Sequence, residues 1–520
     1  MRFGCTLSLA VIVAALAVQL AVAQVVQTDQ GKVEGLKEPN STVTVFKGIP
    51  YAAPPLGDLR WKAPQPVVAW KGVRHADHFG NVCMQNPQAP GSFYQVEFYE
   101  APEPMSEDCL YLNLWTAASS ANEKRPVMVW IHGGGWVEGS GSLPSFNGEA
   151  LAKKGVVVVT INYRLGVFGF LAHPELTKES DYGASGNYGM LDQLAALKWV
   201  KANIRQFGGD PDNVTIFGQS AGAGSVIDLC ASPLAKGYFQ RSIVQSGGFF
   251  TSGDLKSAEA IGIEFSKTAG AHSIAELRKI PAAEIQRLGV PPSNGTGANV
   301  SRFWPIVDGY FLTISPRVVF AAGEQNTHSI IVGSTSNEGS TLIPAAVNAA
   351  EFRSRVEKYY GSRAAEYFKL YPIESDQDAW LAEANGIRDV MADTALVIGR
   401  LQTKTDDKTY IYYFDRHPPG QDSEHYGAFH SSDLVYVFNE LSAVKWPWTD
   451  TDRTLADAMS SYWVNFATTG DPNGGSLPVW PAFGTTPNRG LELGNTIKPI
   501  TDPPDSRLDA VEKNGLGMML

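Results

Sequence analysis

The hydrophobic positions of this chain gather into short runs rich in β-branched residues, and stretches with helical spacing separate these runs. The runs are continuously apolar instead of alternating, which is typical of strands that are buried on both faces of a sheet. We expect seven such strands, at residues 110–115, 127–132, 156–163, 214–217, 242–246, 329–333 and 409–414.

The stretch between residues 186 and 209 predicts a helix, because its apolar residues recur every three or four positions. These residues are Leu194, Leu197, Val200, Ile204 and Phe207, and the pair Gly208-Gly209 is expected to end the helix. Strands that alternate with helices indicate an α/β fold, with a large, mostly parallel central sheet and helices on both of its faces.

Two polar, helical stretches, at about residues 251–300 and 341–400, interrupt the succession of strands and are interpreted as insertions. Ligands of open α/β sheets bind beyond the carboxyl ends of the strands, so we expect the insertions to form walls over an active site. The chain shows neither internal repeats nor a low-complexity linker, and residues 24–520 are therefore predicted to form a single, elaborated domain.

Residues 1–23 have the pattern of a secretory signal peptide: Arg2, an apolar stretch, and Ala21-Val22-Ala23 before Gln24. An uncleaved membrane anchor is the alternative, since the apolar stretch is near the lower length limit for spanning a bilayer. We favour cleavage and a secreted, extracellular protein without stable membrane insertion. The formal net charge of −11 argues against a nucleic-acid partner.

Secretion makes a disulfide between Cys83 and Cys109 an attractive expectation, although sequence alone does not fix the pairing. Cys5 leaves with the signal peptide, and Cys230 is left over. Candidate glycosylation sites with the N-x-Ser/Thr pattern are Asn40, Asn213, Asn294 and Asn299.

Ser220 lies in the sequence Gly218-Gln219-Ser220-Ala221-Gly222, directly after the predicted strand 214–217 and before a helical run. The G-x-S-x-G pattern in this context is typical of a sharp turn that exposes a nucleophilic hydroxyl. A close-packed strand-to-helix turn is the alternative. A second feature, His132-Gly133-Gly134-Gly135-Trp136, follows the apolar residues 127–131 and leaves backbone N–H groups available to bind an oxyanion.

A serine nucleophile needs a histidine base and an acid, and in α/β-hydrolases these follow the serine in the order acid, then histidine. His425 and His430 both follow the strand 409–414, and we favour His430 because an aromatic segment follows it. Glu338, just past the strand 329–333, is the preferred acid. Its rivals are Asp308, Asp389 and Asp393, each of which also has an ordinary explanation as a turn, cap or surface residue.

These features together resemble the type-B carboxylesterase and cholinesterase family of α/β-hydrolases, along essentially all of residues 24–520. The stretches that carry the resemblance are 46–66, 106–115, 127–136, 161–171, 186–200, 207–226 and 336–339. The resemblance implies Ser220 as nucleophile, Glu338 as acid and His430 as base. It also implies an oxyanion hole made by the N–H groups of Gly134, Gly135 and Ala221, and the Cys83–Cys109 disulfide.

The chain departs from cholinesterases at two positions, which argues against a cationic substrate. Tyr99 stands where they carry a tryptophan for cation–π contact, and Gln219 stands where they carry a glutamate before the nucleophile. Tyr99 and Trp136 are the candidate substrate contacts.

The prediction is a secreted serine carboxylesterase that acts on small carboxylic esters, with no metal and no cofactor. A triacylglycerol lipase or a feruloyl-type esterase is the alternative. A non-catalytic adhesion protein of the same family is disfavoured by the intact Ser220, Glu338 and His430.

Overall fold

The structure is a computed structural model that describes residues 24–511, except 88–92, 98–103, 252, 291–301, 345, 406, 421, 486, 488–489, 502–506 and 508–509. Several residues singled out from the sequence therefore lie outside the described residues. These are the expected signal peptide 1–23, the candidate substrate contact Tyr99, and the sequons at Asn294 and Asn299.

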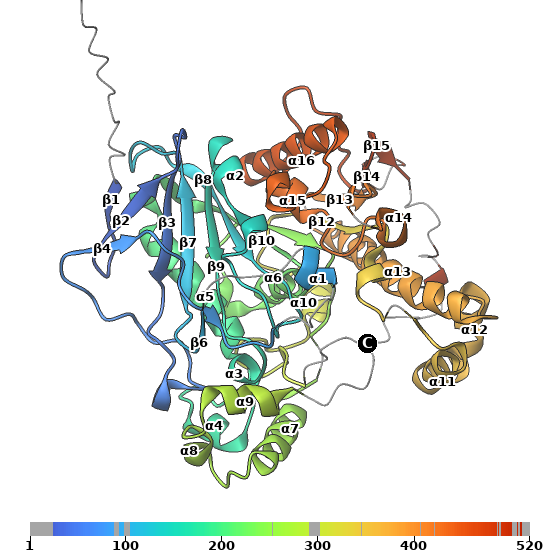
Figure 1. Cartoon of the computed structure of the whole chain (residues 1–520), viewed down its shortest axis with the longest axis horizontal. Coiled ribbons are helices and arrows are strands. Elements are labelled where there is room, and N and C mark those ends of the chain that lie inside the picture. The colour runs from blue at the N-terminus through green and yellow to red at the C-terminus, as the bar shows by residue number, and fades with distance from the viewer. Residues whose placement is uncertain are drawn as a thin grey trace, which may run out of the picture.

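One large sheet dominates the described part of the chain (Figure 1). Thirteen strands form it there, in the spatial order β1-β2-β3-β7-β9-β8-β10-β11-β12-β13-β14-β15, with β4 paired to β2. The strands are β1 (Gln24–Gln27), β2 (Lys32–Lys37), β3 (Thr44–Pro50), β4 (Val73–Ala76), β7 (Tyr111–Thr116), β8 (Arg125–Ile131), β9 (Val157–Ile161), β10 (Gly209–Gln219), β11 (Arg241–Gln245), β12 (Ser329–Thr335), β13 (Thr409–Phe414), β14 (Gly490–Leu493) and β15 (Ile497–Ile500).

The centre of this sheet, from β9 through β14, is parallel, and antiparallel strands extend it at both ends. All seven strands expected from the apolar runs are present. The strand β9 is buried along its whole length, as a strand covered on both faces must be. The predicted fold class, a mostly parallel α/β sheet, is confirmed.

The helices are α1 (Phe93–Glu97), α2 (Glu149–Lys153), α3 (Gly166–Phe170), α4 (Pro174–Glu179), α5 (Tyr188–Asn203), α6 (Ala221–Ala231), α7 (Leu255–Thr268), α8 (Ile274–Leu277), α9 (Ala282–Gly289), α10 (Pro316–Ala322), α11 (Ala349–Tyr360), α12 (Ala364–Leu370), α13 (Asp376–Gln402), α14 (Ser423–Tyr426), α15 (Leu434–Val437) and α16 (Asp450–Thr469). A short 3₁₀ turn, η5 (Glu338–Thr341), follows β12, and β5 (Val82–Cys83) pairs separately with β6 (Met105–Ser106).

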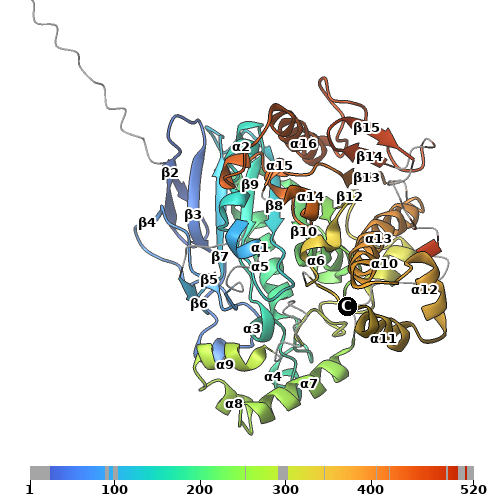
Figure 2. The ribbon, with the colours of Figure 1, turned by 45° about the vertical axis from the view of Figure 1, so that its right-hand side comes forward.

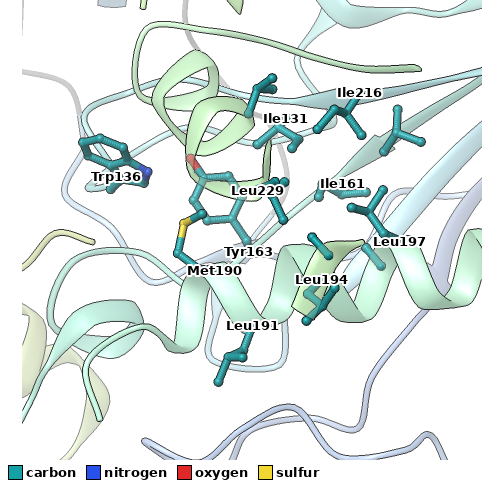
Figure 3. Packing of buried hydrophobic residues seen from close by; sticks show 14 of the residues in the cluster. Ile131, Trp136, Ile161, Tyr163, Met190, Leu191, Leu194, Leu197, Ile216 and Leu229 are labelled. Atoms are coloured by element: carbon teal, nitrogen blue, oxygen red, sulfur yellow. The ribbon is translucent and has the colours of Figure 1, made fainter. Parts of the chain in front are cut away.

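Two apolar cores lie on opposite faces of the sheet, because successive side chains of a strand point to opposite sides. Val129 and Ile131 of β8 belong to the first core, which includes Leu194 and Leu197 of α5. Figure 3 shows Ile131, Ile161 and Ile216, from three neighbouring strands, against α5. Trp130, between Val129 and Ile131 in the sequence, belongs to the second core, together with α15 and α16.

The two predicted insertions are helical in the structure. The first contains α7, α8 and α9, at the lower end of the view in Figure 1. The second contains α11, α12 and the long α13, which have a small apolar core of their own and lie on the right-hand side (Figure 2). The predicted end of α5 is also confirmed: a 3₁₀ turn prolongs it to Phe207, and Gly208 then adopts φ +81°.

The expected disulfide is present, and it closes the segment that contains α1. Cys83 and Cys109 are joined with a Cα–Cα distance of 5.0 Å, while Cys230 is a buried free thiol. Burial raises the pKa of Cys230 to about 12, so this thiol stays protonated and is a poor nucleophile. None of the helices in the described segments is both long enough and apolar enough to cross a membrane.

Candidate active site

Ser220 lies at the junction of β10 and α6, in a backbone conformation that side chains rarely adopt. Its φ and ψ angles are 57° and −125°, and it is half-buried although its neighbours Gln219 and Ala221 are fully buried. The Ser220 N–H donates to the carbonyl of Gln245, 2.9 Å away, which ties the turn to the adjacent β11. A sharp turn of this kind holds a hydroxyl out from the end of the sheet.

The glycines on either side of Ser220 are required by close backbone contacts. A Cβ on Gly222 would lie 2.1 Å from the carbonyl oxygen of Ile131, and one on Gly218 would lie 2.8 Å from the same oxygen. Backbone atoms cannot move aside cheaply, so a side chain at either position would push β8 and α6 apart. The G-x-S-x-G pattern therefore follows from packing as well as from the turn itself.

Glu338 begins the η5 turn three residues after β12 ends and is completely buried. Its Oε1 accepts a hydrogen bond of 2.8 Å from the backbone N–H of Thr335, and its Oε2 lies 2.5 Å from His430 Nδ1. A buried carboxylate needs such partners, and here one of them is an imidazole. The contact fixes which ring nitrogen of His430 faces the acid.

His430 follows β13 and α14 and is 3% exposed. Its second ring nitrogen, Nε2, lies 2.9 Å from Nε2 of Gln219, the residue directly before Ser220. The imidazole thus lies between the carboxylate of Glu338 and the turn that holds Ser220. The structure therefore brings Glu338 and His430 into contact and places the His430 ring against Gln219, the residue next to Ser220.

Three hydrogen bonds join the loop that carries Glu338 to the loop that carries His430. The Asn337 N–H donates to the carbonyl of Ala428 at 3.0 Å, and the Ala428 N–H donates back to Asn337 Oδ1 at 3.1 Å. Ser340 Oγ donates to the carbonyl of Tyr426 at 2.7 Å. These contacts set the register of one loop against the other.

A third segment, α1 inside the disulfide loop, also contacts both loops. The Tyr94 hydroxyl lies 2.8 Å from Thr341 Oγ1, and it donates to the carbonyl of His430 at 3.0 Å. Phe93 packs on Phe429, with ring centroids 4.8 Å apart. Sequence reasoning gave no role to Asn337 or Tyr94. Asn337 belongs to the stretch 336–339 that carries the family resemblance, but its contact with Ala428 and the contact of Tyr94 with His430 depend on how the segments pack.

The rival residues make other contacts. Asp308 accepts hydrogen bonds from the N–H groups of Tyr310 and Leu312, as a turn residue does. Asp389 pairs with Arg388 and accepts from the Tyr371 hydroxyl. His425 stacks on Trp380, with ring centroids 5.2 Å apart, and Asp393 lies on α13. None of these described contacts involves Ser220 or Gln219.

The glycine turn after β8 lies against the serine turn. A Cβ on Gly133 would be 3.1 Å from the Cβ of Ser220, and Gly134 and Gly135 adopt φ of +95° and +61°. Among the hydrogen bonds of the described residues, none uses the backbone N–H of Gly134, Gly135 or Ala221. Three donors therefore remain available beside the hydroxyl.

His132, which begins the glycine turn, is held as a neutral ring. Burial lowers its pKa to about 4, its Nδ1 lies 2.8 Å from the carbonyl oxygen of Gly133, and it stacks on Tyr163 at 4.4 Å. Its ring supports the turn through these contacts.

Trp136, the candidate substrate contact, is buried against α6. Its Nε1 donates to Ser225 Oγ at 2.9 Å, and a Cβ on Gly224, one helical turn after Ser220, would lie 3.0 Å from its ring. Figure 3 shows this indole beside Met190 and Tyr163, at the edge of the first core.

Asp433, three residues after His430, is a further buried carboxyl group that sequence analysis did not find. Its Oδ2 accepts hydrogen bonds from the Tyr412 hydroxyl at 2.8 Å and from Gln245 Nε2 at 3.0 Å. Burial raises its pKa to about 6, and the nearby Glu338 adds to this increase. Gln245 thereby connects the Ser220 turn, through its carbonyl, with the segment that follows His430.

Two of the candidate glycosylation sites are described. Asn40 is exposed in a turn, with φ of 55°. The Asn213 carboxamide instead accepts from Arg241 and donates to the carbonyl of Thr468 at 3.3 Å, so a glycan on this nitrogen would disturb both contacts.

The large, mostly parallel sheet with its covering helices is the fold of the α/β-hydrolases, and the comparisons with known proteins identify the family of the chain. The sequence model of the carboxylesterase family matches residues 22–509, so the chain belongs to this family and is a carboxylesterase.

Two curated relatives show how far the similarity extends. Fumonisin B1 esterase of Sphingopyxis macrogoltabida is 37% identical, over 88% of this chain and 84% of its own length. Para-nitrobenzyl esterase of Bacillus subtilis (strain 168) is 35% identical, over 92% and 96%. A solved structure of a PNB esterase superposes with a TM-score of 0.80 at 34% identity, covering 94% of this chain and 99% of that one.

Proposed function

We propose that this carboxylesterase acts through a catalytic triad of Ser220, His430 and Glu338. The observation that carries the proposal is the buried contact of 2.5 Å between Glu338 Oε2 and His430 Nδ1, with the other ring nitrogen directed at the Ser220 turn. A serine hydroxyl is a poor nucleophile by itself, and an adjacent imidazole that takes its proton makes it reactive.

In the first half of the reaction, Ser220 Oγ attacks the ester carbonyl while its proton moves to His430 Nε2. The resulting oxyanion accepts hydrogen bonds from the N–H groups of Gly134, Gly135 and Ala221, which have no other assigned acceptor among the described residues. The bond to the alcohol then breaks, and His430 returns its proton to the leaving oxygen. An acyl group remains on Ser220 Oγ.

In the second half, water attacks the acyl-enzyme and gives its proton to His430. The second tetrahedral intermediate collapses, the acid leaves, and Ser220 regains its proton. Glu338 accepts from His430 Nδ1 and stabilises the imidazolium that forms in each half.

We further propose that the substrate is a small, uncharged carboxylic ester, and that residues 24–520 act as one secreted domain after removal of residues 1–23. The residue directly before the nucleophile, Gln219, has a neutral side chain, so it cannot attract a cationic substrate as a carboxylate would. This supports an uncharged ester as the substrate. The Cys83–Cys109 disulfide supports an oxidising, extracellular environment.

The test is hydrolysis of p-nitrophenyl esters from acetyl to palmitoyl by the wild type and by Ser220→Ala. We expect the rate to be highest for short acyl chains, and kcat to fall on the order of 10⁴-fold or more in the variant. Ser232→Ala is the matched control, because it removes a hydroxyl just beyond the other end of α6, where Ser232 Oγ donates to the carbonyl of Phe311.

An active Ser220→Ala variant would overturn the proposed triad. A rate that peaks at long acyl chains, and rises once the substrate forms an interface, would instead identify a lipase.

A further inference from the structure

The carboxamide of Gln219 contacts the ring nitrogen of His430 that is expected to take the proton of Ser220. Gln219 is the last residue of β10, its side chain is completely buried, and its Nε2 lies 2.9 Å from His430 Nε2. An amide N–H is a donor only, so His430 Nε2 accepts in this contact. The proton of the neutral imidazole then lies on Nδ1, facing Glu338.

The other end of the same carboxamide is unsatisfied. Gln219 Oε1 is buried and has no hydrogen-bond partner among the described residues. A Cβ on Gly133 would lie 2.9 Å from this oxygen, so the space for the carboxamide exists because residue 133 is a glycine. A buried carbonyl oxygen without a partner is unfavourable, and it is a reason to expect a second state in which the oxygen is used.

We propose that Gln219 is a positioning residue that follows the proton on His430 Nε2 by turning its carboxamide. The proposal rests on the function of Ser220, His430 and Glu338 given above. In the resting enzyme, the amide N–H group donates to the lone pair of the neutral ring. When Nε2 takes the proton of Ser220, a half-turn of the amide brings Oε1 to accept from the new N–H, and the unsatisfied oxygen gains its partner.

A carboxamide suits this task because it offers both a donor and an acceptor. A carboxylate at residue 219 accepts only, so it would favour the imidazolium and raise the pKa of His430. A methionine offers no donor and only a weak acceptor, its thioether sulfur, so it would leave the protonated ring with less support than glutamine gives.

The electrostatic surroundings of His430 already contain two carboxylates, which a third would reinforce. Oε2 of Glu338, on η5, lies 2.5 Å from Nδ1, and Asp433, in the segment before α15, interacts electrostatically with His430. From β13, the Tyr412 hydroxyl donates to Asp433, and from α1, the Tyr94 hydroxyl donates to the carbonyl of His430. A neutral residue on β10 adds no further negative charge beside the base.

The experiment compares the pH dependence of kcat/KM for the wild type, Gln219→Glu and Gln219→Met, between about pH 5 and pH 9 with p-nitrophenyl acetate. We expect Gln219→Glu to move the acid limb of the profile upward by about one pH unit or more. We expect Gln219→Met to move it downward and to lower kcat about tenfold, since a charge-assisted hydrogen bond is lost. The p-nitrophenol burst gives the active fraction of each preparation.

Gln193→Met is the matched control. Gln193 is another buried glutamine whose Oε1 lacks a partner among the described residues, but its Nε2 donates to Ser225 Oγ at 3.1 Å. Its acid limb should coincide with that of the wild type.

The proposal is wrong if the acid limbs of both Gln219 variants coincide with that of the wild type, even where kcat falls. If Gln219→Glu does not fold, the direction of the shift in Gln219→Met decides. Failure of the triad itself would be recognised separately, as activity that remains in Ser220→Ala.

Discussion

The two halves of the candidate active site are built in different ways. The nucleophile turn is local: Gly218 through Gly222 are consecutive, and the strained φ of Ser220 is set between one strand and one helix. The acid and base are 92 residues apart in the sequence, and they meet only because two loops pack against each other at the ends of β12 and β13.

The two halves of the candidate active site therefore depend on different structural features. The serine turn depends on the absence of side chains, because backbone atoms of β8 occupy the space beside Gly218 and Gly222. The acid–base pair depends on contacts between loops, through Asn337, Ser340 and Tyr94. A small change in the first half is therefore expected to disturb folding, whereas a small change in the second is expected to disturb mainly catalysis.

The largest effect is expected for Glu338→Gln, which alters the pair without altering its shape. The new carboxamide cannot stabilise an imidazolium as a carboxylate does, and it favours the wrong tautomer of His430. We expect kcat to fall about 10³- to 10⁴-fold, with little change in the melting temperature. Steady-state kinetics and thermal unfolding of the same preparations measure both quantities.

Asp389→Asn provides the control for Glu338→Gln. It removes another buried carboxylate, which is paired with Arg388 on α13, away from His430. This variant should lose stability while its kcat stays close to that of the wild type. Equal kcat values for Glu338→Gln and the wild type would contradict the role of Glu338.

A smaller effect, now on folding, is expected for Gly222→Ala in the nucleophile turn. The added methyl group would lie 2.1 Å from the carbonyl oxygen of Ile131. We expect the free energy of unfolding to decrease by about 3 kcal/mol, as it does when a packed core is overfilled. Chemical denaturation measures this change.

Gly237→Ala separates the clash from backbone strain. Gly237 has a φ of +85°, but nothing lies within 4 Å of a Cβ placed there. The Gly237→Ala substitution should lower the free energy of unfolding by about 1–2 kcal/mol, which is the cost of placing a side chain in a left-handed backbone conformation. If Gly222→Ala proves no more destabilising than this control, the close approach of β8 is not what requires glycine at residue 222.

The same contrast explains how much the sequence could predict. The runs at 156–163 and 409–414 predicted their strands, because full burial on both faces leaves a continuous apolar pattern. The Ser220 turn could likewise be found, since its glycines are adjacent in the chain. His425 and His430, however, are only five positions apart after the same strand, and the sequence does not show which of them contacts Glu338. The folded structure places His430 against Glu338 and stacks His425, on α14, on Trp380. Gln219 was noted only as a missing charge, because its contact with His430 depends on the folded loops.

The smallest effect is expected for Asn337→Ala, which removes one side chain of the contact between the two loops. The Ala428 N–H loses its acceptor Oδ1, while the backbone bond from Asn337 to Ala428 remains. If the lost hydrogen bond costs about 1.4 kcal/mol in the transition state, kcat falls about tenfold through misalignment of His430, and we expect KM to be nearly unchanged. Asn337→Asp keeps an acceptor of the same reach and should recover most of this loss at the pH plateau.

Asn326→Ala shows whether such a loss is specific to the site. Asn326 also joins two segments, since its Nδ2 donates to the carbonyl of Leu229 at 3.1 Å, but it precedes β12 at the opposite end from Glu338. This control should lower the melting temperature by a similar amount and leave kcat unchanged. A tenfold loss of kcat in both variants would mean that the alignment of Glu338 and His430 depends on the stability of the whole fold. The distinction between a local and an assembled half of the site would then be wrong.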